Sequence, residues 1–378
     1  MRVKELLLRA AKAGGAMRLV RASQWRSKRL LVLCYHGVSM GDEHEWSPEL
    51  FVSPERLRRR LRFLQQGHYN IMPLADGLRR MYEGTLPPRS IAITFDDGGV
   101  DFARAAMPIL QEFDACVTLY LTTYYSSKRL PVFDTMLHYV LWKGRASRRT
   151  PPILDGTGIA LRTVDAAGRD ATGRVLRMHA DALALDSMQR NALVARVAAA
   201  LGVDYAALLE RGTLQIMPAD AIRSLPAALV NVQLHTHRHR VPSAHADFVR
   251  EIHENAAVIR SLRGETHILD QFAYPSGIYT DDAIRWLREC GVEYATTCHT
   301  GLASRASEPL LLPRFIDTMQ QSETAFEAWA TGFHALLPRG RTRFTRADAS
   351  THERRRRELS AADHGNASRR AEPSAGAE

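Results

Sequence analysis

Short apolar runs, separated by stretches with helical spacing, constrain the fold of this chain most. Residues 30–35 (LLVLCY), 91–95 (IAITF) and 116–123 (CVTLYLTT) have the apolar and β-branched character of buried strands. Residues 54–66 (PERLRRRLRFLQQ) between the first two runs repeat leucine at helical spacing and follow a serine that suits a helix start. This alternation of strand and helix predicts an α/β protein with a parallel sheet or barrel.

The alternation breaks in the middle of the chain and then resumes. Helical and hairpin-like stretches fill residues 124–229, and strand signals return at residues 228–234 (ALVNVQL). We interpret the middle stretch as a long, mostly helical insertion. The expected organisation is a basic N-terminal segment over 1–29, an α/β domain over 30–338 with the insertion at about 124–229, and a disordered tail over 339–378.

Positive charge is concentrated at the two ends of the chain. The net charge is +10, but residues 1–29 hold nine Lys/Arg and one acid, and residues 339–378 hold ten Arg and six acids. The body between them is nearly neutral, which disfavours a nucleic-acid-binding face there, so no specific nucleic acid is expected as a partner. The four cysteines form no C-x-x-C pair, and we interpret them as reduced thiols.

Two adjacent carboxylates follow the second strand run. Asp96 and Asp97 come directly after Phe95 and precede Gly98-Gly99. Asp-Gly is a common turn dipeptide, so a tight turn is one explanation. Like charges at the end of a buried strand repel each other, so a cation bound to one of them is the other explanation.

Histidines follow the strand run at residues 228–234 in the same way. His235 and His239 are four residues apart, which places both on one side of a helical turn. Two imidazoles and one carboxylate are a common ligand set for a catalytic divalent metal. In a parallel sheet the carboxyl ends of strands meet at one edge, so one of the two aspartates can complete the set. A run of surface histidines is the alternative, and we accept that alternative for His237.

The combination of TFDDG with a later HTxxH resembles the polysaccharide deacetylase family, also called NodB homology proteins or carbohydrate esterase family 4. Three further stretches are similar to family segments: LCYHGV at residues 33–38, FAYPSG at residues 272–277, and YATTCHTGL with LPRF between residues 294 and 315. The resemblance covers roughly residues 30–318. It implies a distorted (β/α) barrel that removes N-acetyl groups from amino sugars.

Roles for individual residues follow from the resemblance. It implies that Asp97, His235 and His239 bind a divalent metal, which we expect to be zinc, and that Asp96 is the general base. A metal-bound water has a pKa near 7, so a free carboxylate beside it can take its proton. The resemblance also implies metal stabilisation of the oxyanion, with a backbone N–H near Ser276 as a second donor.

The chain departs from the family pattern at two catalytic positions. Many members have an arginine in the third motif that orients the base, whereas this chain has Ala273. Arg314 is a candidate substitute, and a helix-capping or surface role is equally compatible with its sequence. No late Leu-x-x-His is present, so His36, His299 and His334 are candidates for the catalytic acid. We favour His36, at a strand end, although a core histidine is as compatible.

Two functions are consistent with these motifs. The first is a metal-dependent hydrolase that acts on an N-acetylated saccharide. The second is a non-catalytic relative that keeps the metal and binds saccharide in a glycan assembly system. Without an apparent export signal, and with Leu6, Leu7, Leu8, Ala11 and Met17 on a basic helix, we expect a cytoplasmic protein that can contact the inner membrane face. A plain solvated helix is the alternative for that segment.

Overall fold

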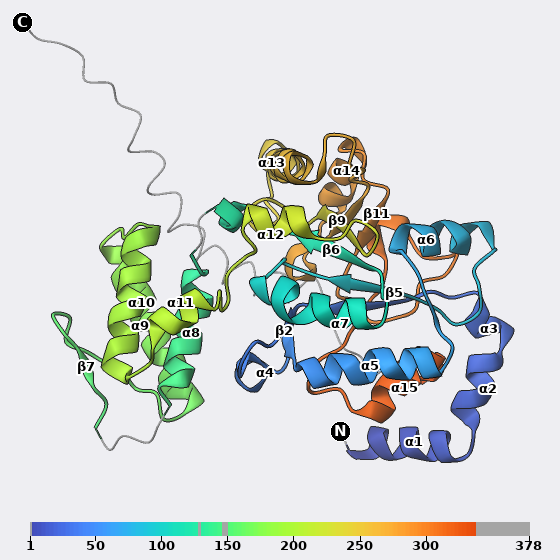
Figure 1. Ribbon diagram of the computed structural model, residues 1–378, viewed down its shortest axis with the longest axis horizontal. Helices are drawn as coiled ribbons and strands as arrows, with labels where there is room; N and C mark the ends of the chain where they lie inside the picture. Colours follow the sequence, from blue (N-terminus) through green and yellow to red (C-terminus); the bar gives the residue numbers. More distant parts are fainter. Residues whose placement is uncertain (1, 128–129, 146–149, 338–378) are drawn as a thin grey trace, which may run out of the picture. The chain divides into compact units, whose positions relative to one another are not determined.

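The computed structural model describes residues 2–127, 130–145 and 150–337, and these form two compact units (Figure 1). Residues 2–132 and 206–337 form the larger unit, and residues 133–205 form the smaller one. The smaller unit lies within residues 124–229, where the sequence predicted an insertion, whereas residues 124–132 and 206–229 of that stretch belong to the larger unit. The predicted disordered tail, residues 339–378, lies outside the described residues.

The larger unit contains a sheet, two short added strands and the helices around them. Its strands are β1 (Leu31–Tyr35), β2 (Gly37–Val38), β3 (Phe51–Val52), β4 (Asn70–Ile71), β5 (Ser90–Phe95), β6 (Val117–Leu121), β9 (Val230–Leu234), β10 (Gln271–Ala273), β11 (Tyr294–Thr296) and β12 (Phe315–Ile316). Its α-helices are α1 (Arg2–Ala13), α2 (Ala16–Ala22), α3 (Gln24–Ser27), α4 (Glu43–Trp46), α5 (Pro54–Gln66), α6 (Leu74–Glu83), α7 (Met107–Glu112), α12 (Ala219–Ser224), α13 (His245–Arg263), α14 (Asp281–Glu289), α15 (Glu323–Thr331) and α16 (Phe333–Leu336). A π-helical turn, η1 (Phe102–Ala106), precedes α7, and short 3₁₀ turns are η2 (Tyr124–Ser127), η3 (Pro275–Gly277) and η4 (Pro309–Leu311).

The main sheet is parallel and nearly closes on itself. Its strands follow the order β11-β10-β9-β6-β5-β1-β12, and β4 pairs with β5. Phe315 of β12 pairs with Leu33 of β1, while Leu312, three residues earlier, forms a parallel bridge with Thr296 of β11. Residues 312–316 therefore touch both edges of the sheet. The predicted distorted (β/α) barrel is confirmed.

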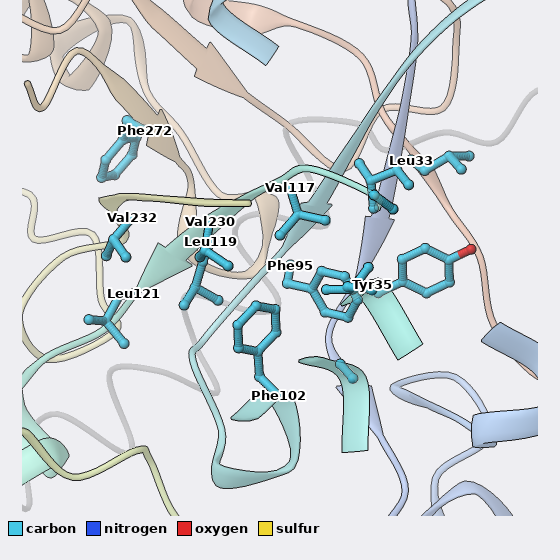
Figure 2. Close-up of a cluster of buried hydrophobic side chains, with 14 of the residues drawn as sticks. Leu33, Tyr35, Phe95, Phe102, Val117, Leu119, Leu121, Val230, Val232 and Phe272 are labelled. Carbon is cyan, nitrogen blue, oxygen red and sulfur yellow. The ribbon is translucent and has the colours of Figure 1, made fainter. Parts of the chain in front are cut away.

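Alternation along the strands separates an apolar outer face from a more polar inner one. Leu33, Tyr35 and Phe95 belong to the large core, which continues through β6, β9 and β10 and into the covering helices (Figure 2). The alternate positions of β5 and β9, including Thr94 and Gln233, point to the other face. Polar residues that directly follow these strands and continue the inward-facing alternation therefore converge within the barrel.

The smaller unit is helical with one hairpin. It contains α8 (Phe133–Lys143), α9 (Ala166–Ala182) and α10 (Ser187–Leu201), and the antiparallel strands β7 (Ile153–Leu154) and β8 (Ile159–Ala160). Helix α11 (Tyr205–Glu210) begins at its last residue. Gly156 and Gly158 have positive φ in the hairpin turn, where the sequence predicted one. Asp186 and Gln189 form a capping box that fixes the start of α10.

The N-terminal helices pack on the barrel through only part of the predicted apolar set. Leu8 and Met17 are buried with Ala328, whereas Leu6 and Leu7 are 64% and 56% exposed. Of the three leucines, Leu8 therefore faces the barrel, and Leu6 and Leu7 face solvent. In the described part of the chain, we find no helix with the length and apolar character needed to cross a membrane.

The chain that returns after the smaller unit runs alongside the two-aspartate loop. The N–H of Val100 donates to the carbonyl of Gln215 at 2.8 Å, and the N–H of Met217 donates to Gly98 at 2.9 Å. Gly99 and Ile216 form an antiparallel bridge between these bonds. The loop after β5 is thus held by backbone hydrogen bonds to residues 215–217.

Candidate metal and catalytic site

The carboxyl ends of the adjacent strands β1 and β5, and of β9 on the far side of β6, supply the polar residues of the site. His36 follows β1, Asp96 and Asp97 follow β5, and His235 follows β9. Strands β1 and β5 pair in register, with Tyr35 opposite Phe95, so the residues that come next start from the same level. The parallel topology therefore brings together side chains separated by up to two hundred residues.

Asp97, His235 and His239 lie within metal-binding distance of one another. Oδ1 of Asp97 is 3.2 Å from Nε2 of His235 and 3.1 Å from Nε2 of His239. These three atoms are grouped closely enough for one ion to touch them all. Sequence reasoning predicted this set of three, and the structure brings it together.

The arrangement of donors and acceptors fits a cation between these atoms. Nδ1 of His235 lies 2.8 Å from the carbonyl oxygen of Ala273, which can only accept, so Nδ1 carries the proton. Nε2 of the neutral ring then presents a lone pair to Oδ1 of Asp97. No residue that the structure describes donates a hydrogen bond to Oδ1, although that atom is buried. Two acceptors that face each other at this distance repel unless a cation or proton lies between them, so the site fits a divalent metal.

The pKa of Asp97 is consistent with an ionised ligand. Burial on its own raises the pKa of this carboxyl group, but protonated imidazoles of His239 and His235, which can donate to it, outweigh that effect and hold the pKa well below its usual range. A cation bound between neutral rings and the carboxylate lowers the pKa in the same direction. The carboxylate therefore needs no deprotonation before it binds an ion.

The loop that bears the histidines is not the helical turn used in the spacing argument. Residues 235–240 form an irregular loop, and both Thr236 and His239 have positive φ, at 62° and 54°. The hydroxyl of Thr236 accepts the N–H of Arg240 at 3.0 Å and closes the loop. Asp97, at φ 71°, is also in the left-handed region. Such conformations cost of order 1 kcal/mol each and often mark functional sites.

Glu251 of α13 holds this loop through hydrogen bonds to its carboxylate. Its buried carboxylate accepts the N–H of Arg238 at 2.7 Å, the Arg238 guanidinium at 3.1 Å and Nε of Arg240 at 2.9 Å. His237 faces away from the metal site, with Nδ1 2.8 Å from the hydroxyl of Thr123. One carboxylate therefore fixes the two arginines that flank His239.

Replacing Glu251 with glutamine is expected to weaken metal binding about 10- to 100-fold, because the amide holds two arginines less firmly and the loop loses its fixed shape. Competition against a metal chelator measures the change. Glu254→Gln is the matched control: Glu254 contacts Arg238 and His237 at the edge of the same network and is more exposed. An unchanged affinity in Glu251→Gln, with the fold intact, contradicts the anchoring role.

Asp96 is bound by Arg314 in a buried, two-pronged ion pair. Nη1 of Arg314 lies 2.7 Å from Oδ1, and Nη2 lies 2.8 Å from Oδ2. Arg314 Nε also donates to the carbonyl of Thr297 at 3.1 Å, which fixes the plane of the guanidinium. The structure thus places Arg314 in neither a helix cap nor a surface position. It contacts the carboxylate that the family arginine orients, from a different part of the chain than Ala273.

The ion pair determines the charge of Asp96. Burial favours the neutral acid, but the guanidinium of Arg314 outweighs it and keeps the pKa of Asp96 below its usual range. Asp96 is therefore ionised at neutral pH and able to accept a proton, while its orientation is fixed by Arg314.

His36 lies beside Asp96 on the solvent side. Its Nε2 is 3.8 Å from Oδ2 of Asp96, and its side chain is 21% exposed. His334, another candidate acid, stacks on Trp329 at 4.2 Å between ring centroids. His299 contacts the ring of Tyr279. Of the three candidates, His36 is the one that the structure places against Asp96.

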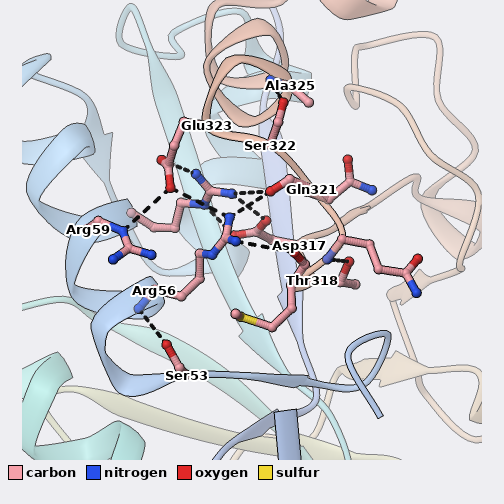
Figure 3. Close-up of polar contacts among 12 residues, drawn as sticks. Ser53, Arg56, Arg59, Asp317, Thr318, Gln321, Ser322, Glu323 and Ala325 are labelled. Carbon is pink, nitrogen blue, oxygen red and sulfur yellow. Dashed lines mark hydrogen bonds and ion pairs between the residues drawn. The ribbon is translucent and has the colours of Figure 1, made fainter. Parts of the chain in front are cut away.

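A buried network outside the barrel holds β12, the strand that follows Arg314 (Figure 3). Nε of Arg60 donates to Oδ2 of Asp317 at 2.8 Å, and the hydroxyl of Tyr35 donates to the same oxygen at 3.1 Å. The N–H of Asp317 donates to the carbonyl of Cys34 at 3.1 Å. Arg60 also pairs with Glu323. The network joins α5, β1 and the end of β12.

Removing one partner of this pair is expected to destabilise the fold. Arg60→Met leaves the buried Asp317 without its cation, and the free energy of unfolding should fall by about 3 to 5 kcal/mol in denaturant titrations. In the double variant Arg60→Met/Asp317→Leu no buried charge is left unpaired, so most of that loss should be recovered. Equal destabilisation in the single and double variants contradicts this explanation.

Sequence reasoning missed two polar residues near the site, of which Asn255 contacts a metal-ligand residue directly. Asn255 of α13 accepts the N–H of His235 at 3.0 Å and donates to the carbonyl of Leu121 at 3.0 Å. Asp101 accepts the N–H of Val38 at 2.8 Å, and burial raises its pKa to about 7. Asn255 is one polar residue in an amphipathic helix, and Asp101 looks like an ordinary helix start. Neither has a sequence signal that distinguishes it.

Comparisons with known proteins concern the family and the fold of the chain. Residues 83–140 match the family model described as polysaccharide deacetylase. The fold is similar to that of the Streptococcus pyogenes deacetylase PplD in complex with acetate, with a TM-score of 0.52, 16% identity, and coverage of 82% of this chain and 99% of that one. IcaB from Ammonifex degensii gives a TM-score of 0.48 and 17% identity, over 80% of this chain and 97% of that one. No curated protein matches the sequence significantly.

Proposed function

We propose that the chain is a polysaccharide deacetylase of the NodB homology type, a hydrolase of amide bonds, and that it removes N-acetyl groups from an amino-sugar-containing polysaccharide or saccharide precursor with the help of a divalent ion. The observation that supports this most directly is the division of labour between two adjacent carboxylates. Asp97 faces two imidazoles, and Asp96 faces an arginine and a third histidine. One carboxylate is arranged to bind a cation, and the other is left to exchange a proton.

The residues of the chain divide the hydrolysis among them. Asp97, His235 and His239 hold the ion, for which zinc suits the ligand set. When bound, such an ion polarises the acetyl carbonyl and lowers the pKa of water. Asp96 accepts the proton of the attacking water, and Arg314 keeps the carboxylate ionised and oriented. His36 donates a proton to the sugar nitrogen as the C–N bond breaks, which releases acetate and a free amine.

Acetate release from N-acetylhexosamine oligomers tests this proposal. The protein loaded with Zn²⁺ should release acetate, and dialysis against a chelator should abolish the activity until the ion is returned. A screen of chitin-like, peptidoglycan-like and exopolysaccharide oligomers identifies the saccharide class. The proposal fails if none of these substrates releases acetate while saccharide still binds.

A non-catalytic saccharide-binding role is the second candidate. The absence of an arginine at Ala273 and of a late histidine favoured it at the level of sequence. Arg314 pairs with Asp96, and His36 lies next to the same carboxylate, so these departures have candidate replacements. A pure binder has no use for the second carboxylate with its own buried arginine.

Contact with a membrane surface is a further part of the proposal. Residues 1–29 carry a net charge of +8, and Lys4, Arg9 and Arg18 are exposed near Leu6, Leu7 and Leu19 in the sequence. Basic side chains interspersed with exposed leucines favour an anionic lipid surface. The cytoplasmic location expected from the sequence stays a prediction.

A further inference from the structure

A second group of potential metal ligands, Cys34, His36 and Asp96, lies next to the group formed by Asp97, His235 and His239. Sγ of Cys34 is 3.7 Å from Oδ2 of Asp96, and Nε2 of His36 is 3.8 Å from the same oxygen. Ligand atoms of all three residues lie within 4.8 Å of one another. Cys34 and His36 are two residues apart at the end of β1, so strand alternation turns both toward the same face.

The chemistry of these three side chains suits a thiophilic divalent ion. A thiolate, an imidazole and a carboxylate are ligands of Zn²⁺ and of softer ions. Zinc bonds of about 2.0 to 2.3 Å place neighbouring ligand atoms about 3.5 Å apart, so small side-chain movements suffice here. The ring of His36 is not held by another bond, since its buried Nδ1 has no hydrogen-bond partner among the described residues. Partial exposure of His36 gives an ion a route from solvent.

The charges around this group decide which ions it accepts. Arg314 occupies one side of Asp96 and repels a cation, so a carboxylate and a neutral imidazole alone are a weak site. The Cys34 thiol is fully buried, and only an ion that binds sulfur strongly enough to displace its proton can recruit it. Hard ions such as Mg²⁺ and Ca²⁺ lack that affinity.

We propose that Cys34, His36 and Asp96 form a second, inhibitory site for a thiophilic divalent cation, such as Cd²⁺ or excess Zn²⁺. Binding replaces the S–H bond of Cys34 with a metal–sulfur bond and releases one proton to solvent. The ion occupies the side of Asp96 that faces His36. The inhibition rests on the roles proposed above for Asp96 and His36, whereas the binding itself does not.

Titration of the Zn²⁺-loaded protein with Cd²⁺ tests both parts. The thiolate-to-Cd²⁺ charge-transfer band in the ultraviolet reports sulfur ligation, and acetate release is followed in the same samples. Wild type should develop the band as one further ion binds and should lose activity in parallel. Cys34→Ser should lack the band and remain active, and its half-inhibitory Cd²⁺ concentration should rise at least about tenfold.

Cys290→Ser is the matched control, because Cys290 is a free, half-buried thiol that belongs to neither group of metal ligands. It should behave like wild type. Cys34→Ala replaces Cys34→Ser if the serine variant melts at a lower temperature. A wild-type protein without the band, or a band that persists without Cys34, overturns the proposal. A band without acetate release from any substrate leaves the second site in place and counts against the deacetylase function instead.

Discussion

Replacing Asp97 with asparagine is expected to abolish acetate release and to weaken binding of the divalent ion by at least about 100-fold. The substitution keeps the size of the side chain but removes the negative charge from the only carboxylate among the three ligands. The two imidazoles that remain are neutral and hold a hydrated cation poorly on their own. Isothermal titration with Zn²⁺ and measurement of acetate from an N-acetylated oligomer give the two values.

Asp101→Asn provides the comparison for Asp97→Asn. Asp101 is another aspartate of the segment that follows β5 and is half-buried, but it is outside the group of metal ligands. Its replacement should leave metal affinity close to that of wild type. If Asp97→Asn binds Zn²⁺ as tightly as wild type, the assignment of Asp97 as a ligand is wrong.

Asp96→Asn is expected to lower kcat by about 10²- to 10⁴-fold and to leave metal affinity nearly unchanged. The amide cannot accept a proton from water, and the contribution of a general base is of this size. Asp97, His235 and His239 contact one another without involving Asp96, so the ion should stay bound. Single-turnover acetate release and metal analysis of the same preparation measure both properties.

The Asp96→Asn variant also distinguishes a loss of catalysis from a loss of folding. Arg314 loses its anionic partner in Asp96→Asn, so some loss of stability accompanies the loss of rate. Because metal content reports on the integrity of the neighbouring loop, a folded, metal-loaded and inactive protein is the expected result. Full activity in this variant excludes Asp96 as the base.

Much of the fold follows from local sequence patterns. The runs 30–35, 91–95 and 116–123 are buried on both faces, as strands of a parallel sheet must be, and their sequence shows it. The closure of the barrel has no such signal. It depends on Leu312 pairing with β11 while Phe315 pairs with β1, and two-residue strands such as β12 have too few residues for a pattern.

The site was predictable where residues with metal-binding or acid–base side chains come at the ends of predicted strands. Asp96, Asp97 and His235 each follow an apolar run directly, so topology alone brings them together. His239 reaches the same point through an irregular loop in which it has a positive φ. The grouping of His239 with His235 from the sequence was correct, but the helical turn on which that grouping was based is absent from residues 235–240. The pairing of Arg314 with Asp96 was one of two equal alternatives, because local sequence does not reveal a contact between residues 218 positions apart.

The loop that bears the two aspartates is bonded to residues 215–217, which belong to the barrel and not to the inserted unit. Its shape therefore does not depend on the identity of the chain between 133 and 205. A change in the length or sequence of residues 133–205 should therefore leave the backbone beside Gly98 and Gly99, and with it the placement of Asp96 and Asp97, unaltered.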